Sequence, residues 1–125
     1  QKIHTQTAPI VFVGGVHGDE PEGVVLAREL LNWLQSDDAS EIVHSWILIP
    51  CLNPDGYRAN RRGNSRGVDL NRNFPVRDWT PVAKAPRYFP GEKPNSEPET
   101  QALVQLLLDT KPQLIVHFHS WEPCV

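Results

Sequence analysis

Three short apolar runs along the chain predict the strands of a sheet. They cover residues 10–13, 45–52 and 114–119. Continuous apolar runs of this length are typical of strands that are buried on both faces of a sheet. The second run is followed by Asn53-Pro54-Asp55-Gly56, a typical turn sequence. The pattern therefore predicts three buried strands, the second of which ends in a turn.

Two segments between these runs repeat apolar residues at helical spacing. The first extends from Pro21 to Gln35, and its proline suits a first helical turn; the second ends at about Asp109. Ser96 and Glu99 have the spacing of a capping box at the start of the second segment. A strand, a helix and a further strand in this order predict a right-handed parallel crossover. We therefore expect an α/β fold with parallel strands.

The segment from Tyr57 to Asn95 shows no sustained periodicity and is rich in Arg, Asn, Gly and Pro. A connection of this length inside a compact domain is usually either functional or disordered. Large apolar residues favour order, because they supply packing anchors: Val68, Leu70, Phe74, Trp79, Tyr88 and Phe89. We expect an ordered loop that packs onto a functional site.

Composition and charge narrow the classes of partner. The chain has 125 residues, of which 39% are hydrophobic and 22% charged, and this is typical of one soluble globular domain. A net charge of -3 gives no basic footprint for nucleic acid, and no apolar run approaches the roughly 20 residues of a membrane span. We expect a small-molecule or peptide substrate, without a nucleic-acid or membrane partner. Cytoplasmic, periplasmic and secreted locations all suit this composition.

A metal site is indicated where the strands end. His17 and Glu20 follow the first run and Gly14-Gly15, and His119 ends the third run. The carboxyl ends of parallel strands meet at one edge of the sheet, where ligands bind. Alone, Glu20 also suits the start of a helix, and His119 also suits a buried histidine. Together they form a set of three ligands that leaves a fourth position for water, the pattern of a catalytic zinc.

A second chemical feature lies in the long segment. Asn71 and Arg72 are adjacent, and several arginines precede them. A guanidinium group binds a carboxylate through two parallel hydrogen bonds, and a neighbouring amide can bind the same group. The pair therefore predicts a site for a free acid end, whereas we expect Arg58 and Arg66 to be solvated. Cys51 and Cys124 have neither metal-ligand nor redox spacing, and we expect two separate thiols.

The chain resembles the zinc carboxypeptidase family, typified by carboxypeptidase A. Five motifs carry the resemblance in the family's order: Gly14-Gly15-Val16-His17-Gly18-Asp19-Glu20, Asn53-Pro54-Asp55-Gly56, Gly67-Val68-Asp69-Leu70-Asn71-Arg72-Asn73-Phe74-Pro75, Ser96-Glu97-Pro98-Glu99 and His119-Ser120. The resemblance spans residues 10–121 and implies one partial catalytic domain over residues 1–125. It implies a three-layer fold, with a twisted, mostly parallel or mixed sheet and helices on both faces. The compact loop is most similar to the bacterial branch that includes murein peptide amidases.

The resemblance also implies a chemistry. It assigns one zinc ion to His17, Glu20 and His119, and the terminal carboxylate of a peptide or muropeptide to Asn71 and Arg72. The implied reaction is hydrolysis of an amide bond next to a free carboxylate, for example the bond between γ-D-glutamate and meso-diaminopimelate.

Two further roles follow from the same resemblance. Arg62 stabilises the oxyanion and is preferred to Arg61, because it starts the Arg-Gly-Asn stretch before the Asn-Arg pair; His117 is expected behind the ligands or in the core. In the family, the general-base glutamate and a tyrosine that closes over the substrate come from beyond the third ligand. Glu97 and Glu99 suit a helix start, and Glu122 is too close to His119. We therefore expect residues 1–125 alone to be inactive.

Two other functions are compatible with these residues. One is the branch of aspartoacylase and succinylglutamate desuccinylase, which hydrolyses N-acyl amino acids and shares the His-x-x-Glu and Asn-Arg elements. The other is a non-catalytic zinc-binding or peptide-binding module. If part of the sheet is missing, its open edge favours self-association or pairing with a completing chain.

Overall fold

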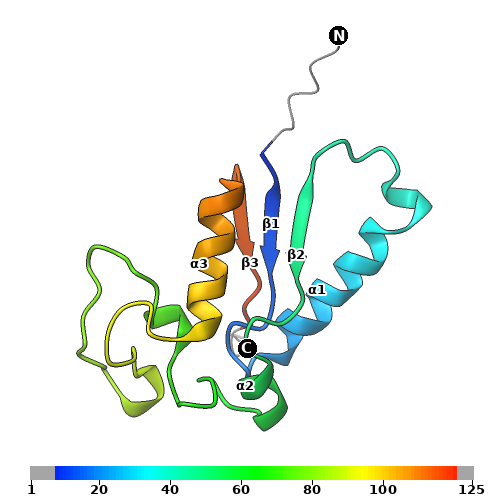
Figure 1. The fold of residues 1–125 in the computed structure, drawn as a ribbon. Helices are drawn as coiled ribbons and strands as arrows, with labels where there is room; N and C mark the ends of the chain where they lie inside the picture. The colour runs from blue at the N-terminus through cyan, green and yellow to red at the C-terminus, as the bar shows by residue number, and fades with distance from the viewer. Residues whose placement is uncertain (1–7, 121–125) are drawn as a thin grey trace.

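A three-stranded parallel sheet forms the centre of the computed structural model, which describes residues 8–120 (Figure 1). The strands are β1 (Ile10–Val13), β2 (Trp46–Ile49) and β3 (Leu114–His117), in the order β2-β1-β3. Val13 at the end of β1 is in register with Ile49 on one side and with His117 on the other. The parallel pairing confirms the predicted α/β fold and brings three strand ends to one edge.

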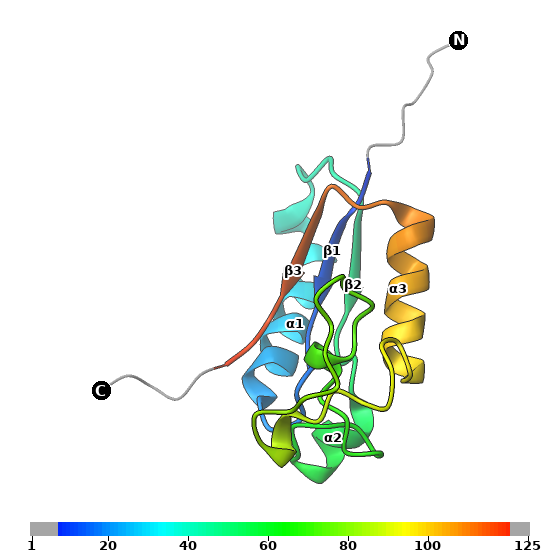
Figure 2. The same cartoon turned by 90° about the vertical axis from the view of Figure 1, so that its left-hand side faces the viewer.

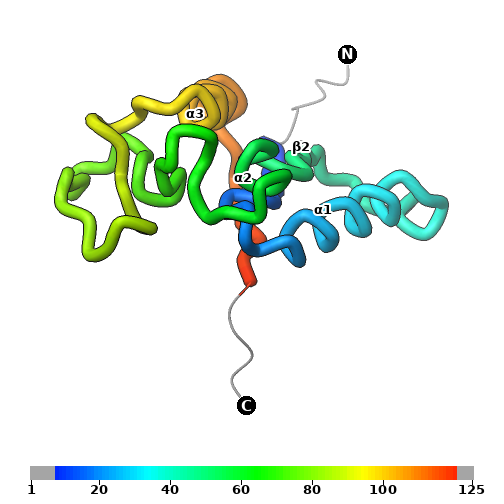
Figure 3. Tube along the Cα trace, turned by 90° about the horizontal axis from the view of Figure 1, so that it is seen from below, coloured from blue at the N-terminus to red at the C-terminus, as the bar shows by residue number. Residues whose placement is uncertain are grey.

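Helices cover both faces of this sheet, so the three-layer prediction is confirmed. Helix α1 (Pro21–Leu34) and helix α3 (Pro98–Thr110) lie on opposite sides of the strands (Figures 2 and 3). Both begin with a proline in the first turn, where its missing N–H costs no hydrogen bond. Their inward faces bury small and branched side chains, namely Gly23, Val24 and Ala27 of α1 and Thr100 and Leu103 of α3. No helix among the described residues is long and apolar enough to cross a membrane.

The core joins the sheet to the long loop. It consists of Val11, Val13, Val16, Leu52, Leu70 and Leu103. Each fully buried aliphatic side chain contributes roughly 1.5–3 kcal/mol to folding. Leu70 belongs to the short 3-10 helix η2 (Leu70–Arg72), so this part of the loop is anchored in the core.

Asn73 fastens the rest of the loop to α3. Its buried amide donates hydrogen bonds to the carbonyl oxygens of Pro90 and Lys93 and to the hydroxyl of Ser96. Its side-chain oxygen accepts hydrogen bonds from the backbone of Glu97, at 3.1 Å, and from the hydroxyl of Thr100. A buried amide with all its hydrogen bonds made fixes one conformation. The loop is ordered, as the sequence predicts.

Two local predictions are wrong. Asn53 does not begin a simple turn but caps helix α2 (Pro54–Ala59), and its side chain accepts a hydrogen bond from the backbone of Gly56 at 2.9 Å. Proline after an Asx residue starts a helix as readily as a turn. At α3 the cap residue is Glu97 and not Ser96. The carboxylate of Glu99 does not reach back to the cap, because it accepts hydrogen bonds from Asn64.

The predicted burial of the strands holds best for β1. Strand β2 is half-buried throughout, and in β3 the side chains of Leu114 and Ile115 are 52% and 41% exposed. The reason is the strand order, because β1 alone has a neighbour on both sides within the described residues. Both outer strands are also shorter than the apolar runs that predict them.

Candidate metal centre and adjoining cavity

The three predicted ligands meet at the carboxyl edge of the sheet. His17 follows β1, Glu20 is the N-cap residue of α1, and His119 follows β3. One ligand atom from each lies within 4.8 Å of the others. Nδ1 of His17 is 2.9 Å from one oxygen of Glu20, and Nδ1 of His119 is 3.0 Å from the other. Two imidazoles and a carboxylate at this spacing fit zinc, which binds N and O ligands at about 2.0–2.2 Å.

Two glycines allow the turn that carries His17 and Glu20. Gly15 has φ +60°, the left-handed region that favours glycine. A Cβ atom at Gly18 would collide with the backbone of Gly56 in α2. The turn that carries these two candidate ligands is therefore packed directly against α2, which is why a side chain is excluded at Gly18.

Glu20 is held in its ionised form. Burial opposes ionisation, but a hydrogen bond from the backbone N–H of Ser120 and the interactions with His17 and His119 outweigh it and lower the pKa of Glu20. A metal ligand must be deprotonated before it binds. The carboxylate of Glu20 can therefore bind a cation without first losing a proton.

Asp69 orients His17 from behind. Its carboxylate is completely buried and lies 3.0 Å from Nε2 of His17. In the tautomer in which Nε2 donates to this oxygen, Nδ1 offers its lone pair to a metal ion beside Glu20. Burial raises the pKa of Asp69, but hydrogen bonds from His17 and Arg62 outweigh it and the pKa is lowered. No pattern in the sequence indicates this role for Asp69, although Asp69 precedes the Asn71-Arg72 pair by two residues.

Arg62 joins the metal centre to the loop. Its Nε donates to Asp69 at 2.8 Å, and its Nη1 is 3.5 Å from Glu20. Its guanidinium group lies 5.0 Å from the ring centre of Tyr88, in a cation–π contact. Arg61 is exposed and has no such partners among the described residues. The structure thus brings Arg62, and not Arg61, to the predicted ligands.

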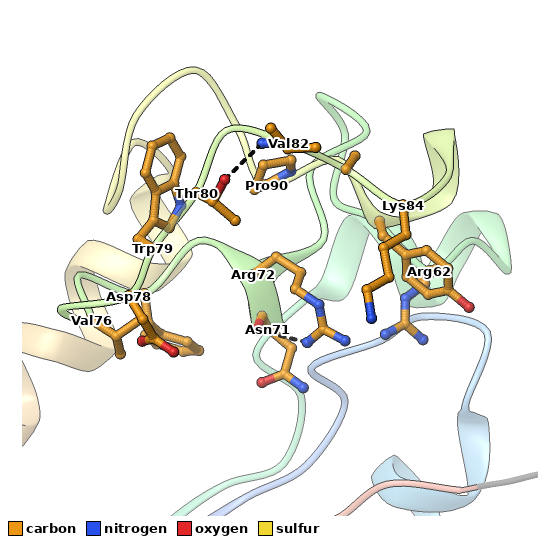
Figure 4. A pocket seen from close by; sticks show the side chains of 13 residues that line it. Arg62, Asn71, Arg72, Val76, Asp78, Trp79, Thr80, Val82, Lys84 and Pro90 are labelled. Atoms are coloured by element: carbon orange, nitrogen blue, oxygen red, sulfur yellow. Dashed lines mark hydrogen bonds between the residues drawn. The ribbon is translucent and has the colours of Figure 1, made fainter.

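A cavity of about 590 Å³ adjoins Arg62. The side chains of Asn71 and Arg72, both exposed, line it together with residues of the long loop (Figure 4). Nη1 of Arg72 donates to the backbone oxygen of Asn71 at 3.2 Å. The rest of the guanidinium group faces the cavity, where a carboxylate has room to bind.

The remaining candidates lie outside this cluster. The ring of His117 is 6.2 Å from that of His119 and meets Phe74 edge-on, and burial lowers the pKa of His117. Arg58 and Arg66 are mainly exposed, as expected, although Nε of Arg66 is 3.6 Å from the buried carboxylate of Glu97. Cys51 is a free thiol. The predictions on Glu122 and Cys124 concern positions outside the described residues.

Comparison with known families decides the relationship. The family described as zinc carboxypeptidase matches residues 2–124. The chain belongs to the zinc carboxypeptidase family. The predicted resemblance is therefore confirmed. The metal of this family is zinc, and His17, Glu20 and His119 form a group that can hold a metal ion.

Relatives within the zinc carboxypeptidase family include bacterial and plant proteins. The chain is 36% identical to murein peptide amidase A of Escherichia coli strain K12, over 92% of the chain and 50% of that relative. It is 33% identical to carboxypeptidase SOL1 of Arabidopsis thaliana, over 80% of the chain and 20% of that protein. The crystal structure of a murein-tripeptide amidase from Escherichia coli O157 superposes with a TM-score of 0.72 at 33% identity, over 96% of this chain and 53% of that one. The chain thus spans about half the length of the murein peptide amidases it matches.

Proposed function

We propose that the protein is a zinc-dependent hydrolase of amide bonds that lie next to a free carboxylate. The observation that carries this proposal is the meeting of three ligands within 4.8 Å beside a cavity lined by Arg62, Asn71 and Arg72. The similarity to murein peptide amidases supports a muropeptide substrate, with the bond between γ-D-glutamate and meso-diaminopimelate as the target. In this proposal residues 1–125 form one partial catalytic domain.

Each residue of the candidate site has a role in the proposed reaction. His17, Glu20 and His119 would hold the zinc ion, which would polarise the scissile carbonyl and lower the pKa of water to about 7. Asn71 and Arg72 hold the free carboxylate and so fix which amide bond lies at the centre. Arg62 donates hydrogen bonds to the carbonyl oxygen as negative charge develops there.

The proposal is tested by hydrolysis assays with the protein at its full natural length and loaded with zinc. We expect release of meso-diaminopimelate from L-alanyl-γ-D-glutamyl-meso-diaminopimelate, detected by chromatography, and no release of acetate from N-acetyl-aspartate or of succinate from succinyl-glutamate. Hydrolysis of the N-acyl amino acids alone would favour the aspartoacylase-like branch. Hydrolysis of neither class would favour a binding module. Residues 1–125 alone are expected to be inactive on all three substrates.

We also infer that the outer edge of β3 is a pairing surface. Within the described residues β3 pairs with β1 alone, and Leu114 and Ile115 are largely exposed beside this edge. Unpaired edges with apolar side chains promote association. We expect residues 1–125 to sediment as dimers or larger species, and Ile115→Lys to shift them toward monomers, with unchanged far-ultraviolet circular dichroism. A concentration-independent monomer in both samples would contradict this inference.

A further inference from the structure

The cavity beside the candidate metal centre contains two cationic side chains that form no ion pair within the described residues. The charge of Arg62 is matched by Asp69 at 2.8 Å and Glu20 at 3.5 Å. Arg72 and Lys84 also line the cavity, and neither forms an ion pair within residues 8–120. Two cationic side chains therefore face this space without a partner from the described part of the chain.

The orientation of Lys84 places its charge where a ligand would lie. Lys84 extends from the long loop toward the guanidinium groups of Arg62 and Arg72, whereas Asn71 lies beside Arg72 (Figure 4). Like charges that converge on one wall repel each other, and an anionic ligand relieves the repulsion. A terminal carboxylate satisfies the planar group of Arg72 and the amide of Asn71. The ammonium group of Lys84 is then left for a second anionic group.

The other residues that line the cavity indicate what kind of molecule could carry both anionic groups. Apolar side chains also line the cavity, among them Phe74, Val76 and Val82. Asp78 lies beside Val76, on the side away from Lys84 (Figure 4). A volume of about 590 Å³ lies within the ordinary range of small-molecule sites, roughly 300–1,000 Å³. The cavity thus suits a hydrocarbon stem that carries one anionic group near Arg72 and a second near Lys84, away from Asp78.

We propose that Lys84 is a specificity-determining residue that binds a second carboxylate on the residue released by hydrolysis. The proposal rests on the proposed function and narrows its substrate to amides of a dicarboxylic amino acid. In meso-diaminopimelate one carboxylate is available to Arg72 and the other, three methylene groups further along, to Lys84. Lysine has the same chain of carbon atoms and the same ammonium group but lacks the second carboxylate. The two amino acids therefore form a matched pair of probes.

The decisive experiment compares tripeptides that end in meso-diaminopimelate or in L-lysine, with the zinc-loaded protein at its full natural length. We expect the unmodified protein to have a higher kcat/KM on the diaminopimelate tripeptide than on the lysine tripeptide. Lys84→Gln should lower kcat/KM on the diaminopimelate tripeptide about tenfold, mainly by raising KM. Lys84→Gln should change kcat/KM on the lysine tripeptide less than twofold, and Lys84→Arg should retain most of the preference. Lys93→Gln, an exposed lysine of the same loop outside the cavity, is the control.

Two results would overturn the proposal. One is unchanged kcat/KM of Lys84→Gln on the diaminopimelate tripeptide, and the other is an equal loss on both tripeptides. Calorimetric binding of free meso-diaminopimelate and free lysine separates this proposal from the proposed function, because binding needs no catalysis. Tighter binding of diaminopimelate that Lys84→Gln abolishes would support the subsite even if neither tripeptide is cleaved. Equal binding of the two amino acids would reject it.

Discussion

His119→Ala is expected to lower zinc affinity by more than about 100-fold. Loss of a group that only supports a ligand typically costs 10–100-fold in metal affinity, and removal of a direct ligand costs more. In the variant only His17 and Glu20 remain, both from the turn after β1, and the segment after β3 no longer supplies a ligand. Elemental analysis and competition with a chelator would measure the loss.

Two other histidines provide controls for this experiment. His44 is exposed in the connection before β2, and His44→Ala should leave the zinc content and affinity unchanged. His117 lies two residues before His119 and outside the group of ligands, so His117→Ala should retain stoichiometric zinc. If His119→Ala binds zinc as tightly as His44→Ala, the assignment of the third ligand is wrong.

The meeting of the three candidate ligands was predictable from the sequence, because the carboxyl ends of parallel strands lie at one edge of a sheet. His17 and Glu20 are local neighbours after β1, and parallel pairing of β1 with β3 brings His119 to the same edge. The apolar runs identify those strands without any knowledge of the loop. The large sequence separation between Glu20 and His119 therefore does not prevent the prediction that they meet.

The partners of these ligands were not predictable, because no periodic pattern controls the long loop. Asp69 reaches His17 across 52 positions, and the loop is held by side-chain hydrogen bonds such as those of Asn73. Hydrophobic periodicity carries no information about such bonds. The cavity wall around Lys84 depends on the same bonds. Strand burial was overestimated for a related reason, since local hydrophobicity does not specify which strand lies at an edge.

Arg62 is predicted to act in the reaction itself and not only in substrate binding. Its Nε is committed to the buried Asp69, which fixes the plane of the guanidinium group, and Tyr88 packs against that group. Its Nη1 lies 3.5 Å from Glu20 and is therefore next to the candidate metal position. A donor fixed in advance beside the reacting carbonyl stabilises developing charge without reorganisation. Arg62→Ala should therefore lower kcat by roughly 10²- to 10³-fold, as loss of an oxyanion donor typically does.

Two controls distinguish a catalytic role of Arg62 from a structural role and from a role of Arg61. In Arg62→Ala, Asp69 still accepts hydrogen bonds from His17 and from the backbone of Asn71, so we expect zinc affinity to fall less than about tenfold. Arg61→Ala removes an exposed side chain and should leave kcat unchanged. A loss of kcat in Arg61→Ala and not in Arg62→Ala would shift the assignment by one residue. A rise in KM with unchanged kcat in Arg62→Ala would instead make Arg62 part of the carboxylate site, because it would mean that the contact is equally strong in the bound substrate and in the transition state.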